Sequence, residues 1–123
     1  MLWRSNNRFT PPVDVIELSD QIIILVEVAG MKPDDFKISL VNRRLLISGV
    51  RHRPDFEITA HHRVEIGYGE FRIDIPLPWS VQNDTVSAAY QEGFLKIALP
   101  RRAERQIRIV NIENTQDEES DDK

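Results

Sequence analysis

Residues 21–28 form the most densely apolar stretch of the chain, and they limit the possible folds more than any other segment. The stretch is rich in β-branched residues, which lose χ1 freedom in a helix and pack well on a pleated sheet, so it predicts a strand. Side-chain alternation gives one face of Ile22, Ile24, Val26 and Val28, and a second face of Ile23, Leu25 and Glu27. Because both faces are mostly apolar, we expect this strand in the middle of a sheet, with its second face also covered.

Short alternating segments separated by turn residues fill much of the remaining chain. An edge strand is expected at residues 13–17, and further strands at 36–40, 45–49, 61–66, 71–75, 86–90 and 95–99. Tight turns are expected at 42–43 and 91–93, and a short helical turn at 32–35. No long helical pattern occurs. Short strands between regular turn signals indicate an all-β protein with a β-sandwich fold.

Composition narrows the classes of protein that this chain could belong to. A length of 123 residues predicts one domain, and the lack of cysteine excludes disulfides and thiolate chemistry. No apolar run is long enough to cross a membrane, and residues 1–7 lack the apolar core of a signal peptide, so we expect a cytoplasmic protein without a membrane partner. A net charge of −4, with acid concentrated in residues 117–122, argues against general nucleic-acid binding.

Residues that could carry catalysis or bind a cofactor do not form a recognisable group. His61 and His62 are adjacent, and neighbouring residues of a strand face opposite sides, so they are poorly placed to share a metal ion. No Gly-x-Ser-x-Gly motif occurs that would expose a nucleophilic serine. We therefore predict a protein that is not an enzyme, with no catalytic residue, cofactor or metal.

Two aromatic residues, Trp3 and Phe9, stand among polar residues at the N-terminus. One interpretation is a disordered tail, as chain termini often are. The other is an arm whose aromatic side chains contact a partner or a client protein. The sequence leaves both interpretations open.

The order of the segments resembles the small heat-shock proteins, the α-crystallin-domain family. The resemblance covers residues 12–100, and its most specific pieces are Ala29-Gly30-Met31-Lys32-Pro33, Leu45-Leu46-Ile47-Ser48-Gly49, Tyr68-Gly69-Glu70-Phe71 and Ala89-Tyr90-Gln91-Glu92-Gly93-Phe94-Leu95. It implies an immunoglobulin-like sandwich of seven to nine strands that forms dimers. It also implies an ATP-independent holdase that binds unfolding proteins and prevents their aggregation.

The resemblance also implies particular contacts between subunits. Dimers are expected to form by strand exchange, with a loop strand of one subunit on the partner's first strand; the residues concerned are Val13, Val15, His62, Arg63, Val64 and Glu65. Ile107 and Ile109 match the family's Ile-x-Ile tail motif. The groove expected to receive this motif on a neighbouring subunit is lined by Phe36, Ile38, Leu40, Val86 and Ala88. Trp3 and Phe9 are the candidate client contacts.

The chain accordingly divides into a short N-terminal arm (1–11), an α-crystallin domain (12–100) and a C-terminal extension with an acidic tail (101–123). The expected partners are unfolding clients, further copies of the chain in a dimer or larger oligomer, and a longer-armed family member that could co-assemble with it. The family's arm is usually longer, which leaves an alternative: a co-chaperone or scaffold module of the CS-domain type that binds one dedicated partner.

Overall fold

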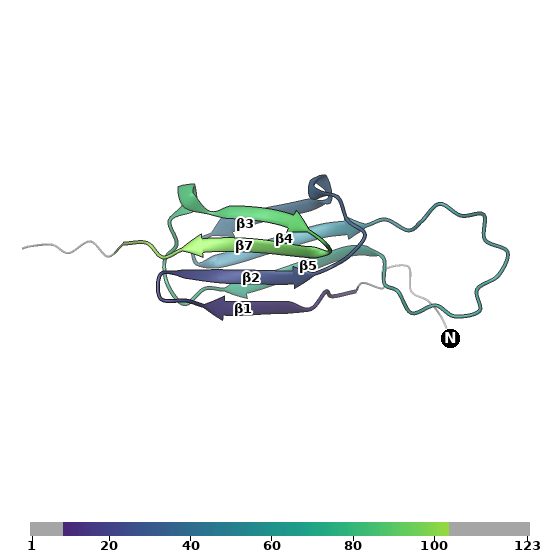
Figure 1. Ribbon diagram of the computed structural model, residues 1–123, viewed down its shortest axis with the longest axis horizontal. Helices are drawn as coiled ribbons and strands as arrows, with labels where there is room; N and C mark the ends of the chain where they lie inside the picture. The colour runs from purple at the N-terminus through teal and green to yellow at the C-terminus, as the bar shows by residue number, and fades with distance from the viewer. Residues whose placement is uncertain (1–8, 104–123) are drawn as a thin grey trace, which may run out of the picture.

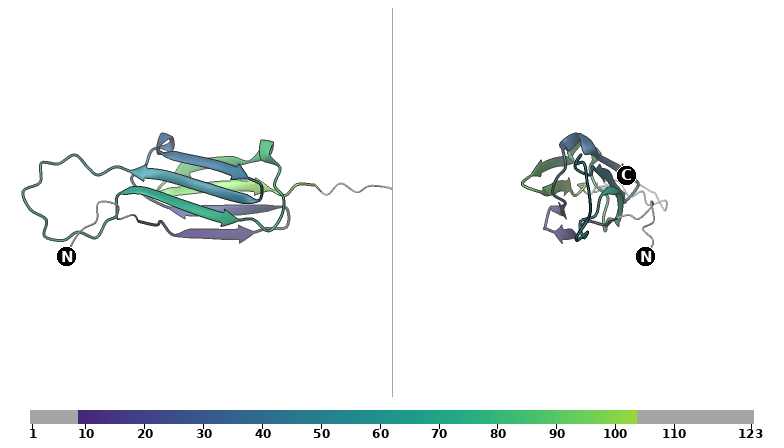
Figure 2. Two further views of the ribbon diagram at one scale, coloured as in Figure 1. Left: turned by 180° about the vertical axis from the view of Figure 1, so that it is seen from behind. Right: turned by 90° about the vertical axis from the view of Figure 1, so that its right-hand side faces the viewer.

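The computed structural model describes residues 9–103, and these form a sandwich of two antiparallel sheets (Figures 1 and 2). One sheet has the strand order β1-β2-β7-β6 and the other has the order β3-β4-β5. The strands are β1 (Val13–Glu17), β2 (Gln21–Glu27), β3 (Phe36–Val41), β4 (Arg44–Arg51), β5 (Gly69–Pro76), β6 (Ser87–Gln91) and β7 (Phe94–Pro100). Two 3-10 turns, η1 (Pro33–Asp35) and η2 (Asn83–Thr85), are the only helical elements among the described residues. The predicted all-β sandwich is confirmed.

Strand β2 lies between β1 and β7, as the apolar run predicts. Its inward residues Ile22, Ile24 and Val26 are fully buried, and Val28, directly after the strand, is 2% exposed. The other face differs from the prediction. Ile23 and Leu25 are only half-buried, and neither of the two sheets covers them. Alternation identifies an apolar face but does not say what packs on it, so the expectation of a covered second face is wrong for the single chain.

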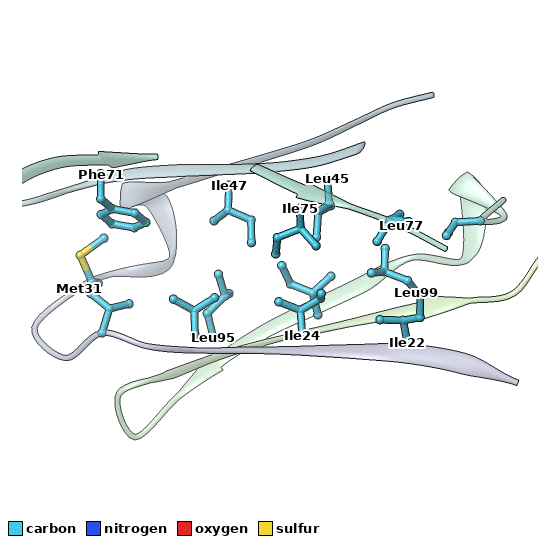
Figure 3. Packing of buried hydrophobic residues seen from close by; sticks show 14 residues of the cluster. Ile22, Ile24, Met31, Leu45, Ile47, Phe71, Ile75, Leu77, Leu95 and Leu99 are labelled. Atoms are coloured by element: carbon cyan, nitrogen blue, oxygen red, sulfur yellow. The ribbon is translucent and has the colours of Figure 1, made fainter. Parts of the chain in front are cut away.

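The core fills the space between the two sheets (Figure 3). Phe71, Ile47 and Leu45 point inward from β4 and β5, and they meet Ile24 and Leu95 from the opposite sheet. No polar or charged residue is buried among residues 9–103. Hydrophobic burial therefore holds the two layers together, and the hydrogen bonds of the ladders hold each layer.

The predicted turns are confirmed, and their backbone angles explain their composition. Asn42 has φ 58° in the β3–β4 hairpin, a left-handed conformation that asparagine tolerates better than most residues. Glu92 and Gly93 have φ 51° and 82° in the β6–β7 hairpin, the paired positive angles of a type I′ turn. At η1, the Asp35 carboxylate accepts a hydrogen bond of 2.8 Å from the backbone N–H of Lys32.

Residues 52–68 connect β4 to β5 without forming a strand. This loop projects from one end of the sandwich, whereas β7 ends at the opposite end (Figures 1 and 2). The strand predicted at residues 61–66 is therefore absent from the single chain. A strand needs a neighbouring edge for its hydrogen bonds, and the loop carries this segment beyond both sheets.

Candidate interaction surfaces

Strand β1 forms an open edge of its sheet. It pairs with β2 on one side only, with Val13 opposite Val26 and Val15 opposite Ile24. Val15 therefore shares the inward face of Ile24, yet it is 50% exposed while Ile24 is fully buried. The exposed N–H and C=O groups and the uncovered valine make this edge competent to pair with a further strand.

The loop 52–68 displays large apolar side chains to solvent. Phe56 is 73% exposed, Ile66 62%, Ile58 47% and Val64 40%. The predicted exchange residues His62, Arg63, Val64 and Glu65 all lie in this loop and are exposed. None of the strand pairings described for residues 9–103 joins them to Val13 or Val15, so the single chain does not bring the two predicted halves of the exchange together.

Strands β3 and β6 are edge strands of opposite sheets, and an aromatic contact joins them. The rings of Phe36 and Tyr90 lie with centroids 5.2 Å apart at an interplanar angle of 53°. The Tyr90 hydroxyl donates a hydrogen bond of 2.7 Å to the carbonyl of Val28 and accepts one of 3.3 Å from the N–H of Met31. Tyr90 thus fixes β6 against the connection that leads from β2 into β3.

The predicted groove residues lie along these two strands, with Val86 directly before β6. Phe36, Ile38, Leu40 and Val86 are half-buried and pack against the core. Ala88 lies opposite the fully buried Ile97 in the ladder, so it faces inward, yet it is exposed. No side chain of the described residues covers it, which leaves the inner surface of β6 accessible at this point. We refer to this region, lined by Phe36, Ile38, Leu40, Val86 and Ala88, as the β3/β6 edge.

Phe9 does not extend freely from the fold. Its ring lies 5.5 Å from that of Phe71, centroid to centroid, and packs against the edge of the core. The other predicted client contact, Trp3, and the tail residues Ile107 and Ile109 lie outside the described residues. Their roles stay predictions.

Arg51 is a residue that the sequence did not single out. It is the last residue of β4, and its guanidinium contacts the carbonyls of Gly67 and Ala29 as well as the ring of Phe9. Its hydrogen-bond partners Gly67 and Ala29 lie 16 and 22 residues away in sequence, so no local pattern marks Arg51 as different from other arginines beside a loop. Only the fold reveals that they meet.

A hollow of about 660 Å³ lies where the chain leaves β7. It is lined by Asp20, Trp79 and Arg101, and the Arg101 guanidinium lies 4.5 Å from the centroid of the Trp79 ring.

Between residues 9 and 103, no group of three histidine or acidic side chains is arranged to hold a metal ion. No helix in this part of the chain is both long and apolar enough to cross a membrane.

Comparison with known proteins agrees with this architecture. Residues 14–113 match the Hsp20/alpha crystallin family. The 22.7 kDa class IV heat shock protein of Pisum sativum is 35% identical over 113 residues, covering 88% of this chain and 57% of the pea protein. Small heat shock protein C2 of Rickettsia felis is 27% identical over 103 residues, covering 83% of this chain and 67% of that relative. The chain thus matches less than two thirds of the pea protein's length.

Solved structures of small heat-shock proteins have the same sandwich. A small heat-shock protein from Xylella fastidiosa superposes with a TM-score of 0.75 at 28% identity, covering 88% of this chain and all of that one. Heat shock protein 16.0 from Schizosaccharomyces pombe gives 0.71 at 27% identity, covering 83% and 99%. The fold is therefore an α-crystallin sandwich. The chain belongs to the Hsp20/alpha crystallin family, whose members are generally non-enzymatic chaperones that form oligomers and bind client proteins. The CS-domain alternative is not favoured by these matches.

Proposed function

We propose that the protein is an ATP-independent holdase of the cytoplasm that binds unfolding proteins and keeps them from aggregating. Its working unit is a dimer in which the loop 52–68 of each subunit pairs with β1 of the other. Dimers are joined into larger assemblies when Ile107 and Ile109 enter the β3/β6 edge of a neighbour. The proposed partners also include a longer-armed relative that co-assembles with it.

The exposed apolar side chains of the loop carry this proposal. A fully buried Val, Ile or Phe side chain contributes about 1.5–3 kcal/mol relative to an exposed one. Phe56, Ile58, Val64 and Ile66 have 40–73% of their surface still in water. Burying the remainder therefore yields on the order of 3–7 kcal/mol per loop, and twice that for a reciprocal dimer. This is comparable to the free energy that association costs, about 4–15 kcal/mol.

The open edge of β1 supplies the backbone hydrogen-bonding groups for such a contact. Val15 and its neighbours present unpaired backbone groups, and each backbone hydrogen bond adds about 0.5–1.5 kcal/mol net. Pairing would also place the loop's apolar residues near Val15, which is half-exposed at the same edge. Hydrogen bonds determine the register and apolar burial supplies most of the affinity, as in other cases where a strand is added to a sheet edge.

The β3/β6 edge supports docking of the tail. Two fully buried isoleucines contribute roughly 3–6 kcal/mol at most, and ordering the tail offsets much of this. A single docked tail is therefore weak. Several tails in one assembly act through their effective concentration, so the oligomer holds together and still exchanges subunits.

Client binding requires no specific sequence in the client protein, because burial of apolar surface is non-directional. The candidate client surfaces are Trp3, Phe9 and the β3/β6 edge when it is not occupied by a tail. Apolar surface that becomes accessible on subunit exchange fits a binder of many unfolding proteins.

The test measures aggregation of a heat-labile client by light scattering, without ATP, together with the native mass of the chaperone. We expect suppression by the wild type near an equal mass ratio. The double variant Val64→Glu/Ile66→Glu should be monomeric, because it places charge where apolar contact is needed. Val41→Glu is the matched control, since Val41 is 52% exposed on the β3–β4 hairpin, away from the loop. Unhindered client aggregation in the presence of a folded wild type would refute the holdase, and a Val64→Glu/Ile66→Glu dimer of normal affinity would refute the exchange.

A further inference from the structure

The Arg51 guanidinium ties together the two ends of the loop 52–68. Arg51 is the residue from which the chain leaves β4, and its Nε and Nη2 atoms donate hydrogen bonds of 2.9 and 2.6 Å to the carbonyl of Gly67, near the start of β5. Its Nη1 atom donates a third, of 3.2 Å, to the carbonyl of Ala29. Charge-assisted bonds from a planar fork are stronger and more directional than neutral ones. One side chain thus sets the separation and orientation of the loop's two ends.

The ring of Phe9 lies against the same guanidinium. The Arg51 Cζ atom is 4.4 Å from the ring centroid, within the range of a cation–π contact. The same ring also contacts Phe71. Phe9 therefore connects the segment that precedes β1 to the end of the loop and to the core.

Gly67 makes room for Phe9. A Cβ atom added at Gly67 would lie 2.4 Å from the Cβ of Phe9 and 2.9 Å from its Cγ, closer than such atoms approach. The backbone of Gly67 does not have a positive φ, whereas Gly69 has φ 97° and open space around it. Gly69 is thus a glycine for backbone reasons, and Gly67 is a glycine because Phe9 occupies the space beside it.

We propose that Phe9, Arg51 and Gly67 form a latch through which the N-terminal segment controls the loop that builds the dimer. With Phe9 in place, Arg51 holds both ends of the loop and the loop is ordered for pairing. When Phe9 leaves, Arg51 loses its aromatic contact, Gly67 loses its neighbour, and the loop end loosens. Because such coupling is reciprocal, dimer formation also strengthens the seating of Phe9. The link to dimer formation rests on the proposed function, whereas the link between Phe9 and loop order does not.

A double-mutant cycle tests the latch with Phe9→Gly, Gly67→Ala and the two combined. The first readout, called loop exchange below, is hydrogen exchange of the ladder amides at the base of the loop, where Val50 pairs with Glu70 and Arg51 with Gly69, at a dilution where the protein is monomeric. The second is the dimer dissociation constant from sedimentation. We expect each single change to speed loop exchange severalfold and to raise the dissociation constant about tenfold. The double variant should be no worse than Phe9→Gly alone, because the new methyl group then has no ring to displace.

Arg51→Lys is the second variant. It retains a positive charge near Phe9 but cannot grip the Gly67 carbonyl with two nitrogens, so loop exchange should again accelerate. Phe9 and Gly67 lie outside all strands, and the midpoint of thermal unfolding verifies that each variant folds. Loop exchange unchanged by Phe9→Gly would overturn the latch, and so would multiplicative effects in the double variant, which would show the two positions to be independent. A wild type that never dimerises would refute the exchange dimer and the latch's role in it, while the exchange rates of the monomer would still decide whether Phe9 orders the loop.

Discussion

Replacing Tyr90 with phenylalanine isolates the hydroxyl that fixes β6 to the connection after β2. The substitution keeps the aromatic ring and its contact with Phe36 at 5.2 Å. It removes the hydrogen bond of 2.7 Å to the Val28 carbonyl and that of 3.3 Å from the Met31 N–H. Both partners belong to nearly buried residues, with exposures of 2% and 8%.

The size of the effect follows from these two bonds. A typical intramolecular hydrogen bond contributes about 0.5–1.5 kcal/mol net, and a buried group left without a partner costs about 1–3 kcal/mol. The 3.3 Å bond lies at the long end of the normal range, so it belongs at the weak end of that scale. We therefore expect Tyr90→Phe to lower the free energy of unfolding by about 2 kcal/mol. For a domain of this size, that lowers the thermal midpoint by roughly 8–16 °C.

Urea unfolding at one fixed protein concentration measures the effect, because the proposed dimer formation would change apparent stability by mass action. Tyr68→Phe is the matched control. It makes the same chemical change where, in the described part of the chain, the hydroxyl makes no hydrogen bond and the ring contacts Arg51 and Arg53. The control should change the unfolding free energy by less than about 0.5 kcal/mol. A loss below about 0.5 kcal/mol for Tyr90→Phe, or an equal loss in the control, would refute the reasoning.

Three further changes test the core, a close backbone approach and a surface ion pair. Ile24→Ala removes most of a fully buried side chain and should cost about 2–5 kcal/mol of unfolding free energy in urea titration. Gly49→Ala should lower the free energy of unfolding by about 1–3 kcal/mol, because the new Cβ would lie 2.8 Å from Cζ of Phe71. An unchanged urea midpoint would mean that the Phe71 ring shifts to accommodate the methyl group. Asp74→Asn breaks an exposed ion pair of 3.0 Å with Arg44 and should change the free energy of unfolding by less than about 1 kcal/mol. A larger loss in thermal unfolding would contradict the expectation that an exposed ion pair contributes little to stability.

The regular part of the fold could be predicted from local patterns. Alternation at Phe36, Ile38 and Leu40 predicts a strand with one apolar face, and β3 has that face packed against the core. Asn42 and Gly93 predict turns because their residue types accept positive φ, and both adopt it. These features depend on residues close together in sequence, so a single sequence contains the information for them.

The features that could not be predicted depend on distant residues or on other chains. Residues 61–66 have the composition of a strand, but the loop carries them beyond the open edges of the chain's own sheets. Ile23 and Leu25 are apolar, yet nothing in their spacing specifies a covering layer. Arg51 meets Phe9 and Gly67 only after two sheets have formed. The candidate interaction surfaces were predicted from family resemblance rather than from spacing. Among the described residues, those of the loop are exposed and most of those at the β3/β6 edge are half-buried, and the proposed contacts themselves require a second subunit.

The sandwich has two open sides, and these two sides determine which oligomer shapes the subunits can form. In the proposed dimer, the side at β1 makes a reciprocal contact, in which each subunit gives its loop and receives the other's, and such a contact is complete with two members. In the proposed larger assembly, the β3/β6 edge makes a one-directional contact, in which one subunit gives its tail and another receives it. A unit that has both kinds of attachment builds chains or closed shells from pairs. The geometric angle between the two sides, rather than the strength of either contact, then determines how many subunits close the assembly.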